Sequence, residues 1–405
     1  MNHTELSENN QILPNDLPSK SRSTIPRFVG SSKKKNENKF LTESVVQDYH
    51  YYLTASQNSM GKRGVLLMNI GTPDEPTIES VRRYLREFLL DPDVIDIPSP
   101  LRHLLVRGII LRTRPRKIAP RYASIWMKEG SPLRVYTQRI SERLSEEMGD
   151  TECEVGMRYG NPSIRSALEK LRSRGVDELM LAPLFPHYAQ ATTVSSTKEA
   201  FSQLRQMNWS PEIFELGHFE DKPSFIKPLS ESIRPHLEEG GHLLFSFHGL
   251  PLSHVKRADK SGRHCQKVDS CCIQSNEANS LCYAHHCNMT AKSVAEELGL
   301  TENEWSICYQ SRLGPAKWLR PSTLSAVEKL AKSGEEVVVV SPAFLADGLE
   351  TLEELDIEAR SHYQSHGGKS FKLVKCLNDD PYWIKGLSNL VEEVFKNFGN
   401  LESAV

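Results

Sequence analysis

Hydrophobic residues fall along this chain in two alternating patterns. Short apolar runs, each ending at a proline or followed by a glycine, suit strands that are buried on both faces of a parallel sheet. These runs cover residues 65–70, 178–183, 243–248 and 337–342. Other segments carry apolar residues three and four positions apart, which predicts amphipathic helices. The clearest of these helices cover residues 78–90, 164–173 and 322–331.

The two halves of the chain repeat the same order of elements. Gly71-Thr72-Pro73 ends the first run, and Gly249-Leu250-Pro251 follows the third. We therefore expect an α/β fold with two Rossmann-like lobes, parallel sheets and a cleft between them. The first lobe is predicted to cover residues 61–200 and the second residues 201–405. No GxGxxG or P-loop signature accompanies the strands, which disfavours a nucleotide-binding protein.

Composition limits the remaining classes. Residues 1–60 are rich in Ser, Asn, Lys and Glu, and we predict a disordered N-terminal extension there. The formal net charge of −2 argues against nucleic-acid binding through bulk positive charge. No apolar run reaches the roughly 18 to 20 residues that span a bilayer, and no signal peptide is visible. We expect a cytoplasmic protein, at most peripherally associated with a membrane.

His248 is the first candidate for chemistry. It ends an apolar run, and in open α/β sheets ligands bind beyond the carboxyl ends of such strands. The alternative is a histidine that belongs to the core or merely caps the strand.

A second candidate is the acidic segment that follows the last apolar run. Asp347, Glu350 and Glu354 are three and four residues apart, so a helix would place them on one face. A solvated acidic helix face is the alternative. If the lobe argument holds, these carboxylates lie on the same side as His248, an arrangement that suits divalent-metal handling or proton transfer.

Short segments of the chain together resemble the motifs of one enzyme family. They are Asn69–Pro73, Tyr122 with Gly130–Leu133, Met157–Gly160, Leu184–Tyr188, Ser246–Pro251, Tyr309–Arg312 and Pro342–Glu354. The family is ferrochelatase, which inserts ferrous iron into a porphyrin to make haem. The resemblance covers residues 64–394 and implies two Rossmann-type domains that hold the flat macrocycle between them.

The resemblance also implies roles for the acidic and histidine side chains. His248 would be the active-site histidine, Glu350 its acidic partner across the porphyrin, and Asp347 and Glu354 a continuation of the carboxylate row. Two pyrrole protons must leave as Fe2+ enters, and histidine and carboxylate can both take protons and bind the metal. Which of His248 and Glu350 does which stays open. Some family members carry a histidine where this chain has Gly348.

Porphyrin contacts are implied for Tyr122, Ser131, Arg158 and Tyr188, with Arg158 suited to a propionate. The alternative places them at the surface or in helix caps. The substrate would be protoporphyrin IX or coproporphyrin III, and the family includes monomers and homodimers. Two other functions compete, namely a chelatase for another tetrapyrrole or metal and a non-catalytic porphyrin- or haem-binding protein.

Residues 98–116 form an apolar segment interrupted by arginines, a composition typical of a helix at a bilayer surface. The family resemblance implies an apolar lip around the cleft there. A packed core helix is the alternative.

Five of the eight cysteines lie between residues 265 and 287. Compared with the family, residues 263–288 resemble an insertion, and some ferrochelatases carry a [2Fe–2S] cluster. Four thiolates suit such a cluster or zinc, and a redox-active set of free thiols is a third option. Adjacent side chains should diverge, so the expected ligands are Cys265, Cys272, Cys282 and Cys287, with Cys271 as a substitute for Cys272. In a zinc site a thiolate could be replaced by His264, His285 or His286.

Overall fold

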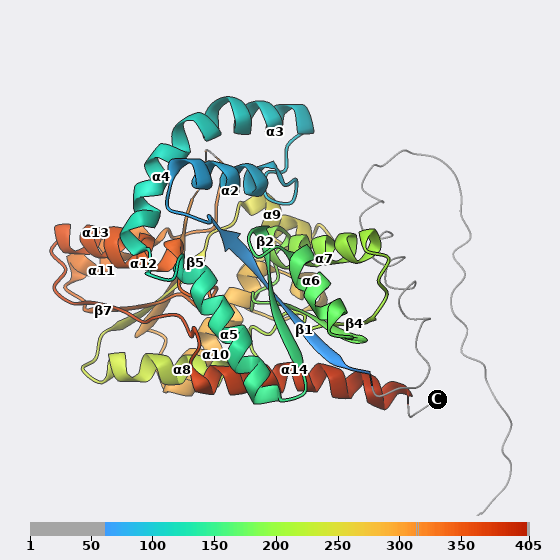
Figure 1. The fold of residues 1–405 in the computed structure, drawn as a ribbon. Coiled ribbons are helices and arrows are strands. Elements are labelled where there is room, and N and C mark those ends of the chain that lie inside the picture. The colour runs from blue at the N-terminus through green and yellow to red at the C-terminus, as the bar shows by residue number, and fades with distance from the viewer. Residues whose placement is uncertain (1–60, 313, 315, 403–405) are drawn as a thin grey trace, which may run out of the picture. The chain divides into compact units, whose positions relative to one another are not determined.

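Two four-stranded parallel sheets form the framework of the computed structural model, which describes residues 61–312, 314 and 316–402 (Figure 1). The predicted extension over residues 1–60 lies outside the described residues. The first sheet has the order β2-β1-β3-β4 and contains β1 (Arg63–Thr72), β2 (Glu152–Gly160), β3 (Glu178–Pro183) and β4 (Glu212–Glu215). The second has the order β6-β5-β7-β8 and contains β5 (His242–His248), β6 (Trp305–Gln310), β7 (Val337–Val340) and β8 (Phe371–Leu373).

The two sheets repeat one topology, which confirms the repeated order of elements in the sequence. In each sheet the first strand along the chain lies between the second and the third, and all pairs are parallel. The four predicted strands are β1, β3, β5 and β7, the two central strands of each sheet.

The first sheet extends beyond the boundary expected at residue 200. Strand β4 pairs with β3 in parallel, with Glu178 opposite Glu212. It has only four residues and no continuous apolar run, so the hydrophobic pattern did not reveal it. The last strand of the first sheet therefore ends at Glu215.

Helices connect and cover the strands. The predicted helices are α2 (Ile78–Leu90), α6 (Ile164–Ser173) and α11 (Thr323–Ser333), and each begins at a side-chain cap: Thr77, Ser163 or Ser322 accepts a backbone N–H bond. The others are α3 (Ser99–Leu105), α4 (Leu111–Ile125), α5 (Pro132–Met148), α7 (Ser195–Gln206), α8 (Pro223–Leu237), α9 (Leu252–Ala258), α10 (Tyr283–Leu298), α12 (Leu349–Leu352), α13 (Arg360–Ser365) and α14 (Pro381–Glu402).

One hydrophobic core is shared by both sheets. Val65 of β1, Phe245 of β5 and Trp383 of α14 belong to the same buried cluster, and all three are fully buried. In Figure 1 helix α14 runs along the lower edge of the molecule, where it packs against α5 and α8. The two lobes are thus two sheets packed around a common interior, with a separate smaller cluster on the outer face of each.

Candidate functional site

His248 is the last residue of β5, at the carboxyl edge of the second sheet. Its Nδ1 lies 2.7 Å from the carbonyl oxygen of Gly249. A carbonyl oxygen can only accept, so Nδ1 carries the proton of the neutral ring and Nε2 keeps its lone pair. Burial lowers the pKa of His248, while the Glu354 carboxylate opposes that shift. The neutral ring can therefore bind a metal ion or accept a proton through Nε2.

Glu350 and Glu354 lie on the segment that follows β7. Glu350 is in the first turn of α12, and Glu354 begins a π-helical segment, η5 (Glu354–Ala359). Burial, reinforced by the Glu350 carboxylate, raises the pKa of Glu354 to about 7. Burial also raises the pKa of Glu350. Glu354 can therefore take up a proton close to neutral pH, and burial favours the protonated form of Glu350 more than in an exposed glutamate.

Asp347 does not continue this row, contrary to the expectation of one helical face. It precedes α12, whose N-cap is Gly348, and its side chain is only 2% exposed. Its carboxylate accepts hydrogen bonds from the Thr351 hydroxyl (3.0 Å) and the Asn378 side-chain amide (2.7 Å). The Cys376 backbone N–H is a third donor, at 3.3 Å. Asp347 is thus a buried anchor for the chain after β7, because both of its carboxylate oxygens already accept hydrogen bonds from neighbouring groups.

Sequence reasoning missed the role of Gln310, although the residue lies within a recognised motif. This buried side chain ends β6, and its Oε1 accepts from the Ser246 hydroxyl at 2.8 Å. Its Nε2 donates to the backbone oxygen of Glu350 at 2.7 Å. Gln310 therefore ties the histidine strand to the acidic segment. The next residue, Ser311, donates its hydroxyl to the Glu354 carboxylate.

Tyr122 and Ser131 lie near the carboxyl end of the first sheet and connect it to the region around Glu350. The Ser131 hydroxyl lies 2.7 Å from the hydroxyl of Thr72, the last residue of β1. Tyr122 belongs to a buried cluster that includes Leu349, the residue before Glu350. Burial raises the pKa of Tyr122, and the nearby Glu350 carboxylate adds to the shift. Residues beyond the carboxyl ends of both sheets therefore meet around Glu350.

Arg158 is already paired with a carboxylate. Its Nη2 lies 2.5 Å from Oδ2 of Asp91, and its Nε donates to the Ser195 hydroxyl at 2.8 Å. The Tyr159 hydroxyl donates to the same Asp91 oxygen at 2.7 Å. The contact of Arg158 with a propionate stays a prediction, and it would require a guanidinium that also serves Asp91.

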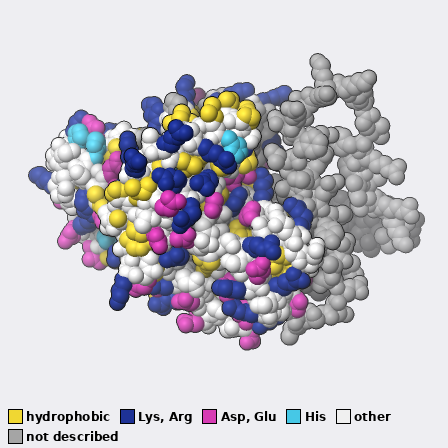
Figure 2. All heavy atoms as spheres, turned by 45° about the horizontal axis from the view of Figure 1, so that its top comes forward, with side chains coloured by type: hydrophobic (Ala, Val, Ile, Leu, Met, Phe, Trp, Pro, Cys, Tyr) yellow, Lys and Arg dark blue, Asp and Glu magenta, His cyan; other side chains and the backbone are white. Residues whose placement is uncertain are grey.

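The apolar segment at residues 98–116 has both a packed and an exposed side. It forms α3, a π-helical segment η2 (Val106–Ile110) and the start of α4. Val106 and Leu111 are buried, whereas Leu101, Leu104 and Ile109 are 56%, 68% and 60% exposed. Figure 2 looks toward the end of the molecule that carries α3 and shows hydrophobic side chains among Lys and Arg. None of the described helices is both long and apolar enough to cross a bilayer.

The cysteine-rich segment brings a different set of thiols together than expected. Cys271 and Cys272 do not diverge, since their sulfur atoms are 3.7 Å apart in a turn. Cys272 is also hydrogen-bonded to Cys282, and Cys265 packs in the same small cluster as both. Cys287 instead lies in the main core and is fully buried. The geometry therefore favours Cys271 over Cys287 as the fourth thiol of the group that contains Cys265, Cys272 and Cys282.

Cys282 is the most acidic thiol of this group. The hydrogen bond with Cys272 lowers the pKa of Cys282 to about 6, and backbone N–H groups of His285 and Ala284 assist despite burial. Cys282 is the N-cap of α10, where such N–H groups are free to stabilise an anion. A thiolate is therefore favoured here, as a metal ligand requires.

The nearby histidines contact the backbone of this segment. His264 Nε2 lies 2.9 Å from the Cys271 carbonyl oxygen, and His285 Nδ1 lies 2.9 Å from that of Cys272. Each ring nitrogen donates to a carbonyl, so the two histidines brace the turn that carries both thiols. Neither nitrogen is then available as a metal ligand.

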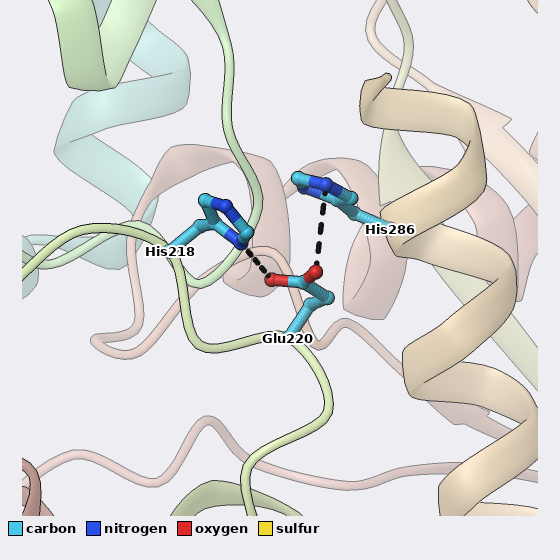
Figure 3. A group of neighbouring side chains, drawn as sticks. All are labelled: His218, Glu220 and His286. Atoms are coloured by element: carbon cyan, nitrogen blue, oxygen red, sulfur yellow. Dashed lines mark hydrogen bonds and ion pairs between the residues drawn. The ribbon is translucent and has the colours of Figure 1, made fainter. Parts of the chain in front are cut away.

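His286 belongs to a trio with His218 and Glu220 (Figure 3). Glu220 accepts from His218 Nδ1 at 2.7 Å, and its other oxygen lies 3.4 Å from His286 Nε2. Two histidines and a carboxylate could compose a metal site. However, His286 Nδ1 accepts from the Tyr188 backbone N–H at 3.2 Å, so Nε2 carries a proton and donates to Ser280 O at 2.8 Å. That proton occupies the nitrogen that would face an ion.

The chain matches the family model for ferrochelatase over residues 62–394. The ferrochelatase of Pseudomonas fluorescens (strain Pf0-1) is 43% identical over 336 residues, which cover 82% of this chain and 98% of the relative. That of Bdellovibrio bacteriovorus is 42% identical over 339 residues, which cover 83% and 100%. The solved structure of SirB from Bacillus subtilis with Fe3+ is 12% identical, with a TM-score of 0.48, and covers 84% of this chain and 98% of that one.

The two ferrochelatases align over nearly their whole length, and the residues matched by the family model contain both sheets as well as His248 and Glu350. The expected family is confirmed. The chain belongs to the ferrochelatase family, lyases that insert Fe2+ into a porphyrin in haem synthesis.

Proposed function

We propose that insertion of Fe2+ takes place between the carboxyl ends of the two sheets, with His248 and Glu350 on either side of the macrocycle. The observation that carries this proposal is a neutral imidazole with a free Nε2 that interacts with the Glu354 carboxylate, which in turn interacts with Glu350; both carboxylates have a raised pKa. As Fe2+ enters the ring, the two pyrrole N–H protons need an acceptor. A carboxylate with a pKa near 7 can accept a proton and release it to water. Tyr122, Ser131, Arg158 and Tyr188 are proposed porphyrin contacts.

The test is a metal-insertion assay with Fe2+ and both protoporphyrin and coproporphyrin. We expect His248→Ala and Glu350→Gln each to lower kcat by about a hundredfold or more. Porphyrin binding, followed by fluorescence quenching, should persist in both variants. His236→Ala, a histidine on α8, is the matched control and should keep full activity. Full activity of His248→Ala would contradict the proposed site.

We also propose that Cys265, Cys271, Cys272 and Cys282 hold a [2Fe–2S] cluster, with zinc as the alternative. The 3.7 Å spacing of Cys271 and Cys272 supports this set. Two thiolates on one tetrahedral ion at about 2.3 Å lie about 3.8 Å apart. The low pKa of Cys282 also supports this set, because it favours the thiolate form that a metal ligand requires. A cluster of this kind would supply a redox-sensitive group that links the three stretches of chain carrying Cys265, Cys271-Cys272 and Cys282.

Visible absorption of aerobically purified protein, with iron and sulfide analysis, tests this ligand set. We expect a coloured protein with about two iron and two sulfide ions per chain. Cys271→Ser should lose the colour, whereas Cys287→Ser should keep it. The reverse result would restore Cys287 as the ligand, and colourless protein with stoichiometric zinc would contradict the cluster.

We further propose that the exposed apolar residues of α3 and η2 contact a membrane peripherally. Leu101, Leu104 and Ile109 support this proposal by their exposure, and Arg107 and Arg112 lie exposed among them. An apolar strip flanked by cations suits the surface of an anionic bilayer. A poorly soluble porphyrin could then pass between the membrane and the site.

A further inference from the structure

The peptide bond between His248 and Gly249 is held at both of its polar atoms. Its N–H, on Gly249, donates to the Gln310 backbone oxygen at 2.8 Å. Its carbonyl, on His248, accepts from the Tyr283 hydroxyl at 2.8 Å. The next carbonyl along the chain, that of Gly249, holds the imidazole Nδ1–H. The Tyr283 hydroxyl therefore holds the carbonyl of His248, and the next carbonyl along the chain, that of Gly249, orients the His248 imidazole.

Tyr283 is well placed to hold a carbonyl rigidly. It is the first residue of α10 and is 7% exposed. Its ring lies in the main core and meets the His187 ring edge-on, with centroids 5.9 Å apart. A buried ring of this kind has little freedom, so its hydroxyl has a fixed position relative to β5.

We propose that Tyr283 is a positioning residue for iron insertion, whose hydroxyl holds the His248 carbonyl and so orients the His248 imidazole. This inference rests on the catalytic role proposed for His248. Without the hydroxyl, the carbonyl loses this partner and only the Gly249 N–H bond to the Gln310 backbone oxygen still holds the peptide, which can then rotate about that remaining contact. Rotation would move the Gly249 carbonyl as well, and with it the direction in which Nε2 points.

The same helix start connects this bond to the cysteine segment. Cys282, a proposed cluster ligand, directly precedes Tyr283 and caps α10. One turn later, His286 accepts from the backbone N–H of Tyr188, in the loop after β3. The first turn of α10 therefore touches both the histidine strand and a loop with a proposed porphyrin contact. Displacement of Cys282 on metal loss would move the Tyr283 hydroxyl away from His248.

The test is Tyr283→Phe, with Tyr363→Phe as the matched control. Tyr363 is also a buried tyrosine, 1% exposed, and its hydroxyl donates to the Glu335 backbone oxygen at 2.5 Å, before β7 begins. Both variants lose one buried hydroxyl–carbonyl bond, so their thermal midpoints should fall by similar amounts. We expect kcat of Tyr283→Phe to fall about tenfold or more, because small misplacement of a reacting group is costly. Its KM for porphyrin and its iron content should not change, and Tyr363→Phe should keep the parental kcat.

Equal kcat values for the two variants would overturn the positioning role. His248→Ala separates this outcome from failure of the proposed site: an inactive His248→Ala beside an unaffected Tyr283→Phe refutes only the role of Tyr283. The link to the cysteines is tested by adding Tyr283→Phe to Cys282→Ser, or to Cys265→Ser if the former does not fold. Non-additive losses in kcat would support the link, and additive losses would refute it.

Discussion

At the scale of single residues, protonation states set the chemistry of the site. The Gly249 carbonyl selects the Nδ1–H tautomer of His248 and leaves Nε2 free. For Glu350 and Glu354 the cause is burial, since desolvation favours their protonated forms and so raises the pKa of both carboxyl groups. A histidine at the end of a strand could be recognised from the sequence. Its tautomer could not, because it depends on a backbone carbonyl that the fold places beside the ring.

Glu354→Gln should stabilise the protein at alkaline pH. The pKa of Glu354 is about 7 in the folded chain, whereas an unfolded glutamate titrates near 4.3. The native state therefore binds this proton more tightly, and ionisation of Glu354 costs stability as pH rises from about 4 to 7. At pH 8 the variant should gain about 1–2 kcal/mol in the free energy of unfolding, less than the full shift because the side chain is partly open to water.

Urea denaturation at several pH values measures this gain, which should shrink toward zero as the pH falls to about 4.5. Glu358→Gln, an exposed glutamate on the same π-helical segment, is the control and should change stability little at any pH. A gain that does not depend on pH would show that the Glu354 carboxylate is not desolvated.

At the scale of elements, the acidic segment departs most from its prediction. The spacing of Asp347, Glu350 and Glu354 predicts one continuous helix, but only Leu349–Leu352 is α-helical before the chain widens into η5. Asn378 and Thr351 hold Asp347 outside the helix. Helical periodicity cannot reveal this departure, because it depends in part on Asn378, which lies 31 residues further along the chain. As a result Asp347 has a structural role, whereas Glu350 and Glu354 can exchange protons.

The apolar segment α3–η2 gives a prediction at this scale. Replacing Leu101, Leu104 and Ile109 together with serine should weaken cosedimentation with anionic phospholipid vesicles by about tenfold or more, because exposed apolar area is lost. Leu324→Ser, at a 36% exposed leucine on α11, is the control and should bind as the parent does. Unchanged binding of the triple variant would contradict the membrane role.

At the scale of the whole molecule, the sequence predicts the central strands of each sheet better than the edge strands. The central strands β1, β3, β5 and β7 were evident because burial on both faces leaves a continuous apolar run. The edge strands β2, β4, β6 and β8 mix polar and apolar residues, and were missed. The same limit applies to the site: His248 and Glu350 were found from motifs. Gln310 and Tyr283 act through backbone atoms of other elements, and only the fold brings these together.

Helix α14 has a consequence for how this protein is made. Trp383 and Leu387 complete the core that Val65 and Ile140 begin more than 200 residues earlier. During synthesis the apolar faces of β1 and α5 must therefore wait for α14 before they are fully covered. A nascent chain stopped before Pro381 would expose this surface, however complete its two sheets. The last helix to be synthesised therefore decides when the apolar surface of the first half is covered.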